Sequence, residues 1–540
     1  MVYKGPEPLR PIEERPLGTW LMEHIAANGH LPAFIDGVTG AELSNAQLHS
    51  WVLSVETGLH QLGFSKGEVG GVVMANCPEF AVLLLALTRR GGILSSANPA
   101  STKDELVRQL RDCGAKLAFT DMDRAPLVAA ACQETPKIQS IFVVCSASEA
   151  ASLDGRQKLR PFYDLRVPAQ LLPPVKLDVR EDLAVLPYSS GTTGPPKGVM
   201  LSHYAIAAQS SALDLPDLPI PNRGEHLLAF LPFYHIYGMV IVMGVALSRG
   251  VPLVTVPKFT PHLFLRLIQD HKIKTLLSVP PILVFLTKDE LTKQFDLSSL
   301  QIVMVGAAPA GQDLIAEFRT KFPHVQYVVQ GFGMTEVAGA SIVMRATPVA
   351  NAKSASCGEL CPGFEGKLVD PESGEEILEA GRRGEICMRG PCLMSGYFDR
   401  PDATMATVDE QGWLHSGDVG YVDNEEHWYV VDRIKELIKV RGFQVAPAEL
   451  EDLLLSCPGV ADAAVIGIPD EAAGELPKAY IVRSQNSNIK AADVHAFLKG
   501  KVTHYKMLKG GVEFVSELPK SPSGKILRRF LRNQAAKSKL

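Results

Sequence analysis

The sequence predicts a mixed α/β protein with a large N-terminal domain of helix-covered, mostly parallel sheets and a smaller α+β C-terminal domain. Up to about residue 330, short apolar runs alternate with helical patterns, as in repeated βαβ units. After Gly381 the segments become short, β-rich and separated by turn residues, which predicts a small β-barrel-like region. After Ile434 a compact mixture of helical and strand patterns follows and forms the second domain.

The elements of the N-terminal domain follow from the periodicity of its apolar residues. Residues from about Leu17 to Leu62 are predicted to be largely helical, because apolar residues such as Leu21 and Ile25 recur at helical spacing. A strand over 69–74 precedes a helix over 81–89. Further strands are expected at 117–120, 141–144, 227–230, 251–256, 275–279, 302–305 and 325–329. The proline-rich run 167–175 is predicted to be a surface connection.

The remaining elements lie on either side of a domain boundary at about residue 432. Strands are expected at 384–389, 428–431, 460–468 and 479–482, and helices at 448–455 and 491–498. Pro447 comes just ahead of the first of these helices, where its missing N–H costs little. The sequence thus divides into residues 1–432 and 433–540.

The composition is that of an ordinary globular protein, with 46% hydrophobic and 21% charged residues among 540. The longest apolar stretch, about Tyr237 to Leu247, is too short to span a bilayer, and the N-terminus lacks the pattern of a signal peptide. The nine cysteines form no CxxC pair and show no zinc-site spacing. We therefore expect an intracellular protein whose cysteines are reduced and individually buried.

Charge is distributed unevenly along the chain. The net charge is −5, yet from Lys490 onward twelve Lys or Arg stand against three Asp or Glu, which gives +9 there and −14 elsewhere. A basic segment of this kind suits an anionic ligand, an anionic surface or nucleic acid. Nucleic-acid binding is not expected, because no aromatic residues alternate with the basic ones.

The segment from Tyr188 to Gly198, Tyr-Ser-Ser-Gly-Thr-Thr-Gly-Pro-Pro-Lys-Gly, has the composition of a loop that binds polyphosphate. It follows an apolar run, 183–187, that is predicted to be a buried strand. Its glycines allow positive φ, and its hydroxyls and lysine supply donors and a positive charge. It differs from a Walker loop, because Gly191 and Gly194 are too close together and Lys197 is not adjacent to either.

Four further motifs follow this loop: Gln330-Gly-Phe-Gly-Met-Thr-Glu336, Gly412-Trp-Leu-His-Ser-Gly-Asp418, Asp432-Arg433 and Leu518-Pro-Lys-Ser-Pro-Ser-Gly-Lys525. In this order the five motifs resemble the adenylate-forming superfamily of acyl-CoA synthetases, 4-coumarate–CoA ligases and beetle luciferases. The segments 431–439 and 444–450 are most similar to the 4-coumarate–CoA-ligase-like and luciferase-like branch. The resemblance covers the chain from about residue 20 to its end. It implies activation of a carboxylic acid by ATP to an acyl-AMP, release of pyrophosphate, and transfer of the acyl group to coenzyme A, with Mg²⁺ as the metal.

The resemblance also assigns roles in the adenylation step. The residues implied to hold the β- and γ-phosphates are Ser189, Ser190, Gly191, Thr192, Thr193, Gly194 and Lys197. Thr335 would contact the α-phosphate, and Glu336 would hold Mg²⁺. The adenine slot would be formed by Gly306, Ala307, Ala308, Pro309, Gln330, Gly331 and Phe332. Asp418 and Arg433 would bind the ribose, and Lys525 would bridge the carboxylate and the α-phosphate.

The second step, in which a thiol attacks the acyl-AMP, is implied to need a mobile C-terminal domain. That domain would rotate about Lys435, which removes Lys525 and brings in the loop from Lys439 to Gln444. Gly442 would let the pantetheine arm pass, and Lys258 and Arg441 would meet the phosphates of coenzyme A. His235, among aromatic residues, is implied to guide the carboxylate.

The acid itself is expected to be apolar. The resemblance implies a pocket lined by Tyr237, Gly238, Met304, Val305, Gly331, Val337, Ala338 and Gly339. Hydroxycinnamate ligases usually place Lys-Ser where this chain has Met304-Val305, so a buried phenol would lack that partner. We therefore expect a fatty or other apolar acid. Three alternatives stay open. They are a 4-coumarate–CoA ligase, a luciferase-type monooxygenase that acts on an adenylated luciferin, and an inactive nucleotide-binding protein.

The sequence closes on Ser538-Lys539-Leu540, a tripeptide that the peroxisomal import receptor reads as an address. A basic segment precedes it, which would present the tripeptide to a receptor. We therefore expect the protein to be delivered to the peroxisome.

Overall fold

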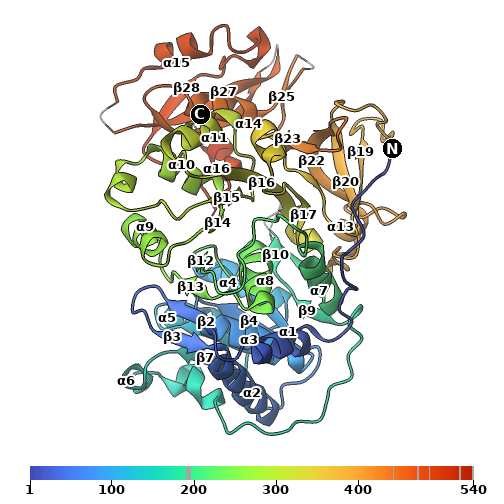
Figure 1. Cartoon of the computed structure of the whole chain (residues 1–540), viewed down its shortest axis with the longest axis vertical. Coiled ribbons are helices and arrows are strands. Elements are labelled where there is room, and N and C mark those ends of the chain that lie inside the picture. Colours follow the sequence, from blue (N-terminus) through green and yellow to red (C-terminus); the bar gives the residue numbers. More distant parts are fainter. Residues whose placement is uncertain (190–195, 442, 471–472, 486, 522–523, 538–540) are drawn as a thin grey trace.

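The computed structural model describes residues 1–189, 196–441, 443–470, 473–485, 487–521 and 524–537. The fold is the predicted mixed α/β fold, with a large N-terminal and a smaller C-terminal domain. In Figure 1 most of the blue and teal segments lie in the lower half, the first residues run up to the β-rich region at the right, and the orange-red C-terminal domain lies at the top, above helices α10 (Pro280–Lys288) and α11 (Gln312–Lys321).

The largest sheet lies in the lower half of Figure 1 and consists mainly of parallel strands. Its strand order is β10-β11-β9-β5-β4-β6-β7-β8, with β21 paired to β11. The strands are β4 (Val69–Val73), β5 (Ile93–Ser96), β6 (Leu117–Asp121), β7 (Ser140–Val144), β8 (Leu159–Pro161), β9 (Leu183–Val185), β10 (Tyr188–Ser189), β11 (Lys197–Ser202) and β21 (Gly396–Tyr397). Every residue of β4 is buried, as expected for a parallel strand with both faces covered by helices.

Two smaller sheets complete the parallel part of the fold, in the orders β12-β13-β2-β3 and β14-β15-β16-β17-β18. The strands are β2 (Pro32–Asp36), β3 (Glu42–Ser44), β12 (Leu227–Ala229), β13 (Leu253–Thr255), β14 (Thr275–Ser278), β15 (Ile302–Val305), β16 (Tyr327–Met334), β17 (Gly339–Val343) and β18 (Glu359–Leu360). The carboxyl ends of β15 and β16 lead into the segments that carry Gly306 and Thr335. Open α/β sheets bind their ligands at this edge.

Helices cover these sheets and begin at recognisable caps. For example, Thr102 and Glu105 form a reciprocal capping box at the start of α4. The helices are α1 (Leu17–Ala27), α2 (Asn45–Gln61), α3 (Pro78–Arg89), α4 (Lys103–Asp112), α5 (Ala125–Gln133), α6 (Ala147–Ala150), α7 (His203–Ala212), α8 (Val245–Arg249), α9 (Pro261–Asp270), α12 (Pro348–Ala352) and α13 (Pro401–Met405). The apolar stretch that begins at Tyr237 forms a buried π-helix, η3 (Tyr237–Gly244). Among the described residues, no helix is both long and apolar enough to cross a membrane.

The β-rich region is a five-stranded antiparallel sheet with the order β1-β19-β20-β22-β23. Its strands are β1 (Tyr3–Lys4), β19 (Glu365–Val369), β20 (Gly384–Arg389), β22 (Leu414–Val422) and β23 (Trp428–Arg433). The sheet curls so that the rings of Tyr3 and Trp428, on its two edge strands, meet edge to face at 5.5 Å. This contact gives the region its barrel-like form.

The C-terminal domain has its own sheet, with the order β25-β24-β27-β26 and β28 paired to β27. Its elements are β24 (Ile438–Val440), β25 (Phe443–Val445), α14 (Pro447–Leu455), β26 (Val460–Asp470), β27 (Gly474–Arg483), α15 (Ala491–Leu498), β28 (Val512–Val515) and α16 (Arg528–Lys537). The sheet and α14 enclose a hydrophobic core that includes Ile438, Leu450 and Val465. Pro447, which was expected just ahead of this helix, is its first residue, where its missing N–H is tolerated.

The prediction of a largely helical segment from Leu17 to Leu62 is wrong in its middle. Strands β2 and β3 separate α1 from α2 there. Their pattern is set by distant partners, because β2 pairs in parallel with β13, more than two hundred residues away. The proline-rich run 167–175 has no regular secondary structure, as predicted.

Candidate functional site

The predicted phosphate loop is flanked by a hairpin of β10 and β11. Ser189 stands directly opposite Lys197 in this pair. The side chain of Tyr188 fixes the first strand, because its hydroxyl donates to Asp112 Oδ2 at 2.7 Å. The other predicted loop residues, Ser190, Gly191, Thr192, Thr193 and Gly194, lie outside the described residues.

Lys197 is linked to Glu336 through Tyr397, a residue that the sequence analysis did not identify. The Lys197 Nζ lies 4.7 Å from the centre of the Tyr397 ring, and the Tyr397 hydroxyl donates to Glu336 Oε1 at 2.8 Å. Strand β21 brings Tyr397 here by pairing with β11, opposite Val199. Nothing in the local sequence predicts this pairing, because it joins segments almost two hundred residues apart.

Glu336 is a suitable ligand for the implied magnesium ion. It is 5% exposed, and no Lys, Arg or His of the described chain forms an ion pair with it. A buried carboxylate without a cationic partner is costly, and a bound cation would relieve that cost. Mg²⁺ usually binds to one or two carboxylates together with phosphate oxygens and waters. With ATP present, Glu336 would hold the ion, and the ion would neutralise phosphate charge.

Backbone geometry at the end of β16 places Thr335 and Glu336. They lie in the short 3₁₀ turn η5 (Thr335–Val337), which ends at Ala338 with a positive φ of 57°. Strands β16 and β17 approach so closely that a Cβ on Gly333 would fall 1.9 Å from the carbonyl oxygen of Gly339. The glycine is therefore required for the turn to close.

The loop of the predicted adenine slot is held by Gln330. Gly306 donates its N–H to Ser278 O, and Ala307 adopts a positive φ of 70°. Gln330 Oε1 accepts from Ala310 N at 2.8 Å, and its Nε2 donates to the carbonyls of Ala310 and Ser354. The slot residues Ala307 and Pro309 are exposed, and Ala308, Gly331 and Phe332 are half-buried. Gln330 thus shapes the slot through the backbone.

The predicted ribose pair is assembled by adjacent strands. Asp418 in β22 is directly opposite Arg433 in β23, and Arg433 Nε lies 3.2 Å from Asp418 Oδ1. Asp418 is 5% exposed, and burial raises its pKa, whereas the charges of Arg433 and Lys525 oppose that change. The second oxygen of this buried carboxylate is available for a sugar hydroxyl.

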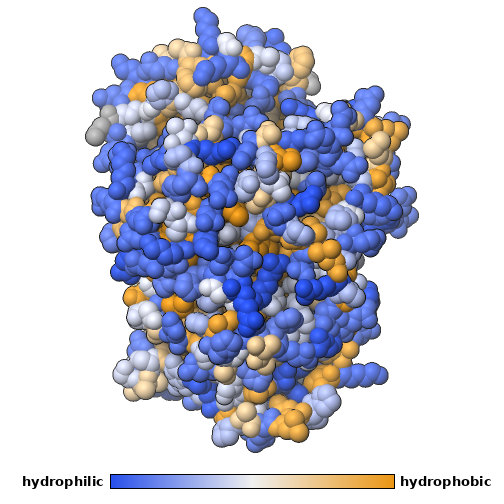
Figure 2. Space-filling model, in the orientation of Figure 1, coloured by the Kyte–Doolittle hydropathy of each residue, from blue (hydrophilic) through white to orange (hydrophobic). Residues whose placement is uncertain are grey.

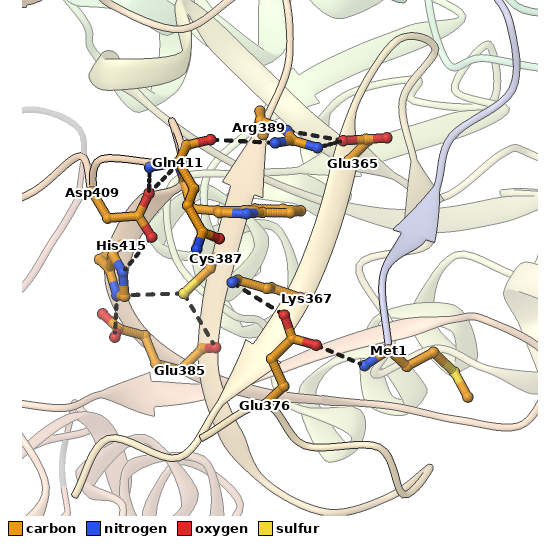
Figure 3. Close-up of polar contacts among 11 residues, drawn as sticks. Met1, Glu365, Lys367, Glu376, Glu385, Cys387, Arg389, Asp409, Gln411 and His415 are labelled. Carbon is orange, nitrogen blue, oxygen red and sulfur yellow. Dashed lines mark hydrogen bonds and ion pairs between the residues drawn. The ribbon is translucent and has the colours of Figure 1, made fainter. Parts of the chain in front are cut away.

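A cluster of polar side chains supports the turn that precedes Asp418 (Figure 3). Glu385 Oε1 accepts from the N–H of Gly417 at 3.0 Å, and its Oε2 lies 2.8 Å from Nδ1 of His415. The sulfur of Cys387 lies 3.4 Å from the same nitrogen. These three side chains are of metal-binding types, and their ligand atoms all lie within 4.8 Å of one another. Hydrogen bonds to Cys387 and Glu385 raise the pKa of His415 to about 10, and the hydrogen bond from the N–H of Gly417 ties the cluster to the backbone. The cluster therefore fixes the backbone beside Asp418.

Lys525 reaches the site from the C-terminal domain. Its loop rests on the start of α10, where a Cβ on Gly524 would fall 2.6 Å from Pro281 Cγ. Burial and the nearby charge of Arg433 lower the pKa of Lys525, whereas Asp418 opposes that shift. The positive charge of Lys525 also contributes to a low pKa at His235. Residues from both domains thus converge on one centre.

His235 is held in a neutral state by its surroundings. Burial, with a contribution from Lys525, lowers its pKa to about 4. Its Nδ1 accepts from Tyr237 N at 3.4 Å, so the proton of the neutral ring lies on Nε2. The turn before it is clamped by buried Asn76, which donates to the carbonyls of Ala229 and Leu231 and accepts from Phe233 N. Sequence analysis missed Asn76, because a lone asparagine after a strand resembles an ordinary turn residue.

The structure does not bring the residues of the predicted second step to this centre. Lys439, Arg441 and Gln444 are exposed, and the strands that pair with β24 belong to the C-terminal domain. Lys258 is exposed on the N-terminal domain, and Gly442 lies outside the described residues. Lys435 is exposed between β23 and β24, where the chain passes from one sheet to the other.

The predicted acid pocket is a buried, largely apolar region between η3 and the ends of β15, β16 and β17. The buried lining residues are Tyr237, Gly238, Met304, Val305, Val337, Ala338 and Gly339, and Gly331 is half-buried. A Cβ on Gly331 would fall 2.8 Å from Met304 Cε, so the methionine fills the space beside this glycine. The hydroxyl of Tyr237 is buried, and it has no hydrogen-bond partner among the described residues.

Comparison with known proteins identifies the family of the chain. The model of the AMP-binding enzyme family matches residues 21–398, and that of the AMP-binding enzyme C-terminal domain matches residues 449–525. A 4-coumarate–CoA ligase of Pinus taeda is 39% identical over 96% of this chain and 95% of its own. A 4-coumarate–CoA ligase of Vanilla planifolia is 39% identical over 97% of this chain and 94% of its own. ATP-bound MatB from Rhodopseudomonas palustris superimposes with a TM-score of 0.82 at 27% identity, over 96% of this chain and 98% of its own. The chain belongs to the AMP-binding enzymes, the adenylate-forming family that its motifs resemble.

Proposed function

We propose that the protein is an AMP-forming acid–CoA ligase. It activates a carboxylic acid with ATP, releases pyrophosphate, and then transfers the acyl group from acyl-AMP to coenzyme A. The observation that carries this proposal is the convergence of Lys525, from the C-terminal domain, with Asp418 and His235, from the N-terminal domain.

This arrangement suits a reaction between two anions. A carboxylate must approach the α-phosphate of ATP, so catalysis depends on positioning and on neutralising negative charge. Lys525 and Lys197 supply positive charge, and Glu336 would hold Mg²⁺ beside the phosphates. The neutral His235 has its proton on Nε2, from which it can donate to the carboxylate without adding a charge. Asp418 and Arg433 would fix the ribose, so that the AMP part stays in place while pyrophosphate leaves.

We propose a hydroxycinnamate-type acid as the substrate. The relatives named 4-coumarate–CoA ligases, which match almost the full chain at 36–39% identity, support this choice over a fatty acid. The chain has Met304-Val305 in place of the Lys-Ser that usually meets a phenolic oxygen. The buried hydroxyl of Tyr237, which has no hydrogen-bond partner among the described residues, is another polar group of the pocket.

Hydroxylamine trapping of acyl-adenylates tests the reaction and the acid together. The panel contains 4-coumarate, caffeate, cinnamate, and medium- and long-chain fatty acids, each with and without coenzyme A. We expect ATP-dependent hydroxamate from the hydroxycinnamates and thioester when coenzyme A is added. If every acid fails to give product, the ligase proposal is wrong. If only fatty acids react, the reaction stands and the hydroxycinnamate proposal is wrong.

We also propose delivery to the peroxisome through Ser538-Lys539-Leu540, which lie outside the described residues. Support comes from the tripeptide itself and from its position beyond α16. A fluorescent fusion that keeps the native C-terminus should collect in peroxisomes, and the same fusion without these three residues should not. Equal distribution of the two fusions would contradict the proposal.

A further inference from the structure

The side chain of Gln209 in α7 is buried without a partner. The residue is 0% exposed, and neither Oε1 nor Nε2 has a hydrogen-bond partner among the described residues. An amide can donate two hydrogen bonds and accept two, so leaving all of them unmade is unfavourable. Such a group in a native structure needs an explanation, and a bound substrate can supply the missing partner.

Gln209 lies at the wall of the acid pocket. A Cβ on Gly339 would fall 3.4 Å from Gln209 Oε1 and 3.2 Å from Ile241 Cδ1, so the amide lies against the bare backbone of a lining glycine. Ile241 is one turn beyond Tyr237 in η3, and η3 contacts both α7 and β17. The amide therefore lies deeper along η3 than Tyr237, whereas His235 and Lys525 lie at the end where the carboxylate reacts.

Tyr237 and Gln209, whose buried polar groups have no hydrogen-bond partner among the described residues, lie at different depths of the pocket. A Cβ on Gly306 would fall 3.5 Å from the Tyr237 hydroxyl, which places this hydroxyl beside the adenine-slot loop. The Gln209 amide is next to Gly339 and the apolar side chain of Ile241. The neighbours Val337 and Ala338 are fully buried and apolar. Gln209 is thus an isolated polar group in an apolar wall.

We propose that Gln209 recognises a hydrogen-bonding group at the end of the acid remote from its carboxylate, such as a phenolic hydroxyl. This proposal rests on the acid–CoA ligase function. A hydroxyl both donates and accepts, and so does an amide, so the two groups can satisfy each other. An alkyl chain in the same place would bury the amide permanently unpaired, and a site built around a hydrogen bond discriminates against a substrate that lacks it.

The experiment uses pairs of acids that differ only in the distal hydroxyl: 4-coumarate with cinnamate, and 12-hydroxydodecanoate with dodecanoate. The rate of pyrophosphate release gives kcat/KM for each acid with the wild-type enzyme and with Gln209→Met, which keeps the length of the side chain and removes the amide. We expect the wild-type enzyme to prefer the hydroxylated member of at least one pair. Gln209→Met should lower that preference about tenfold or more, and leave the KM for ATP unchanged.

Ser210→Ala serves as the matched control. Ser210 is the next residue of α7, but it lines a different, small cavity with Leu17 and Leu84. This variant should keep the preference of the wild-type enzyme. The proposal is overturned if Gln209→Met retains the preference, or if the wild-type enzyme prefers the unsubstituted acid in both pairs. A wild-type enzyme that forms no adenylate from any of the four acids would instead contradict the proposed ligase function for these acids.

Discussion

Lys525 and Lys439 belong to the same small domain but lie in opposite environments. Lys525 is half-buried against the N-terminal domain. Burial and the charge of Arg433 lower its pKa, and its own charge helps to lower the pKa of His235. Lys439 is exposed on β24, and its backbone N–H donates to Glu475 of the same domain. One lysine is therefore in place for chemistry at the nucleotide site, and the other is not.

Under the proposed function, this orientation of the domain is the one that suits adenylation. A single site cannot hold both lysines at once, because one surface of the domain faces it at a time. The second step would then require the domain to turn about Lys435, so that the surface with Lys439 replaces the surface with Lys525. Figure 2 shows hydrophobic residues gathered near the middle of an otherwise largely hydrophilic face.

The largest expected effect is that of Lys525→Ala on adenylation. The variant loses the charge that neutralises the carboxylate and the α-phosphate, so hydroxamate formation should fall about 10²–10³-fold. Thiolysis of preformed acyl-AMP, measured as thioester formed from coenzyme A, should stay close to the wild-type rate. Equal losses in both half-reactions would contradict the division of labour between the two lysines.

The second prediction concerns Lys439→Ala. Its loss should slow thioester formation from preformed acyl-AMP about tenfold or more, because a group that positions the thiol step is removed. Adenylation, measured by pyrophosphate release without coenzyme A, should be nearly unchanged. Lys490→Ala, on the same domain, provides a control for loss of one positive charge. If Lys439→Ala damages adenylation as much as Lys525→Ala does, the domain does not turn in the way proposed.

The pH dependence of adenylation should report the unusual environment of Lys525. The lysine must be protonated to neutralise phosphate, and in the free enzyme its pKa is lowered. The kcat/KM for adenylation should therefore fall as the pH rises through a value below the roughly 10.4 of an ordinary lysine. Thiolysis of preformed acyl-AMP should lack this limb, and a limb at the ordinary value in adenylation would contradict the prediction.

The smallest effect is expected from Asp452→Asn, at the contact between α14 and α11. Burial and the charge of Asp313 raise the pKa of Asp452 to about 6, and its Oδ1 is buried without a partner among the described residues. Because the pKa is raised, the docked orientation is most stable below the unperturbed pKa of about 4 and weakens as the pH rises through 6. At pH 8, Asp452→Asn should strengthen docking and slow the thioester step about two- to fivefold.

The matched condition for this variant is low pH. As the pH falls toward the unperturbed pKa of about 4, the wild-type Asp452 side chain becomes protonated in both the docked and the undocked state, so the rates of the two proteins should converge. A difference that is the same at both pH values would show that the carboxylate charge does not control docking.

The sequence predicted much of the fold because apolar runs alone define many of its strands and helices. Strand β15 and helix α15 match the expected 302–305 and 491–498 to the residue. The motifs also pointed to Asp418, Arg433 and Lys525, which the structure brings together across two domains. This convergence could be expected only from the family resemblance, because the resemblance assigns all three residues to one nucleotide site.

Other features depend on contacts that no local pattern encodes. Strands β2 and β3 are placed by β13, and Tyr397 reaches Glu336 only because β21 pairs with β11. Asn76 clamps a turn more than 150 residues away. Gln209 is one of several polar residues of α7, and what distinguishes it is that its amide is buried without a hydrogen-bond partner among the described residues.

Asp432, at the end of β23, connects its own strand to the C-terminal domain through its two carboxylate oxygens. One of its oxygens accepts from the N–H of Arg433, and the other accepts from Ala448 N at 2.9 Å, in the first turn of α14. These two partners lie on opposite sides of Lys435, so a rotation there must pull them apart. If the domain rotates as proposed, breaking the hydrogen bond between the Asp432 carboxylate and the start of α14 would contribute to the activation barrier of that rotation.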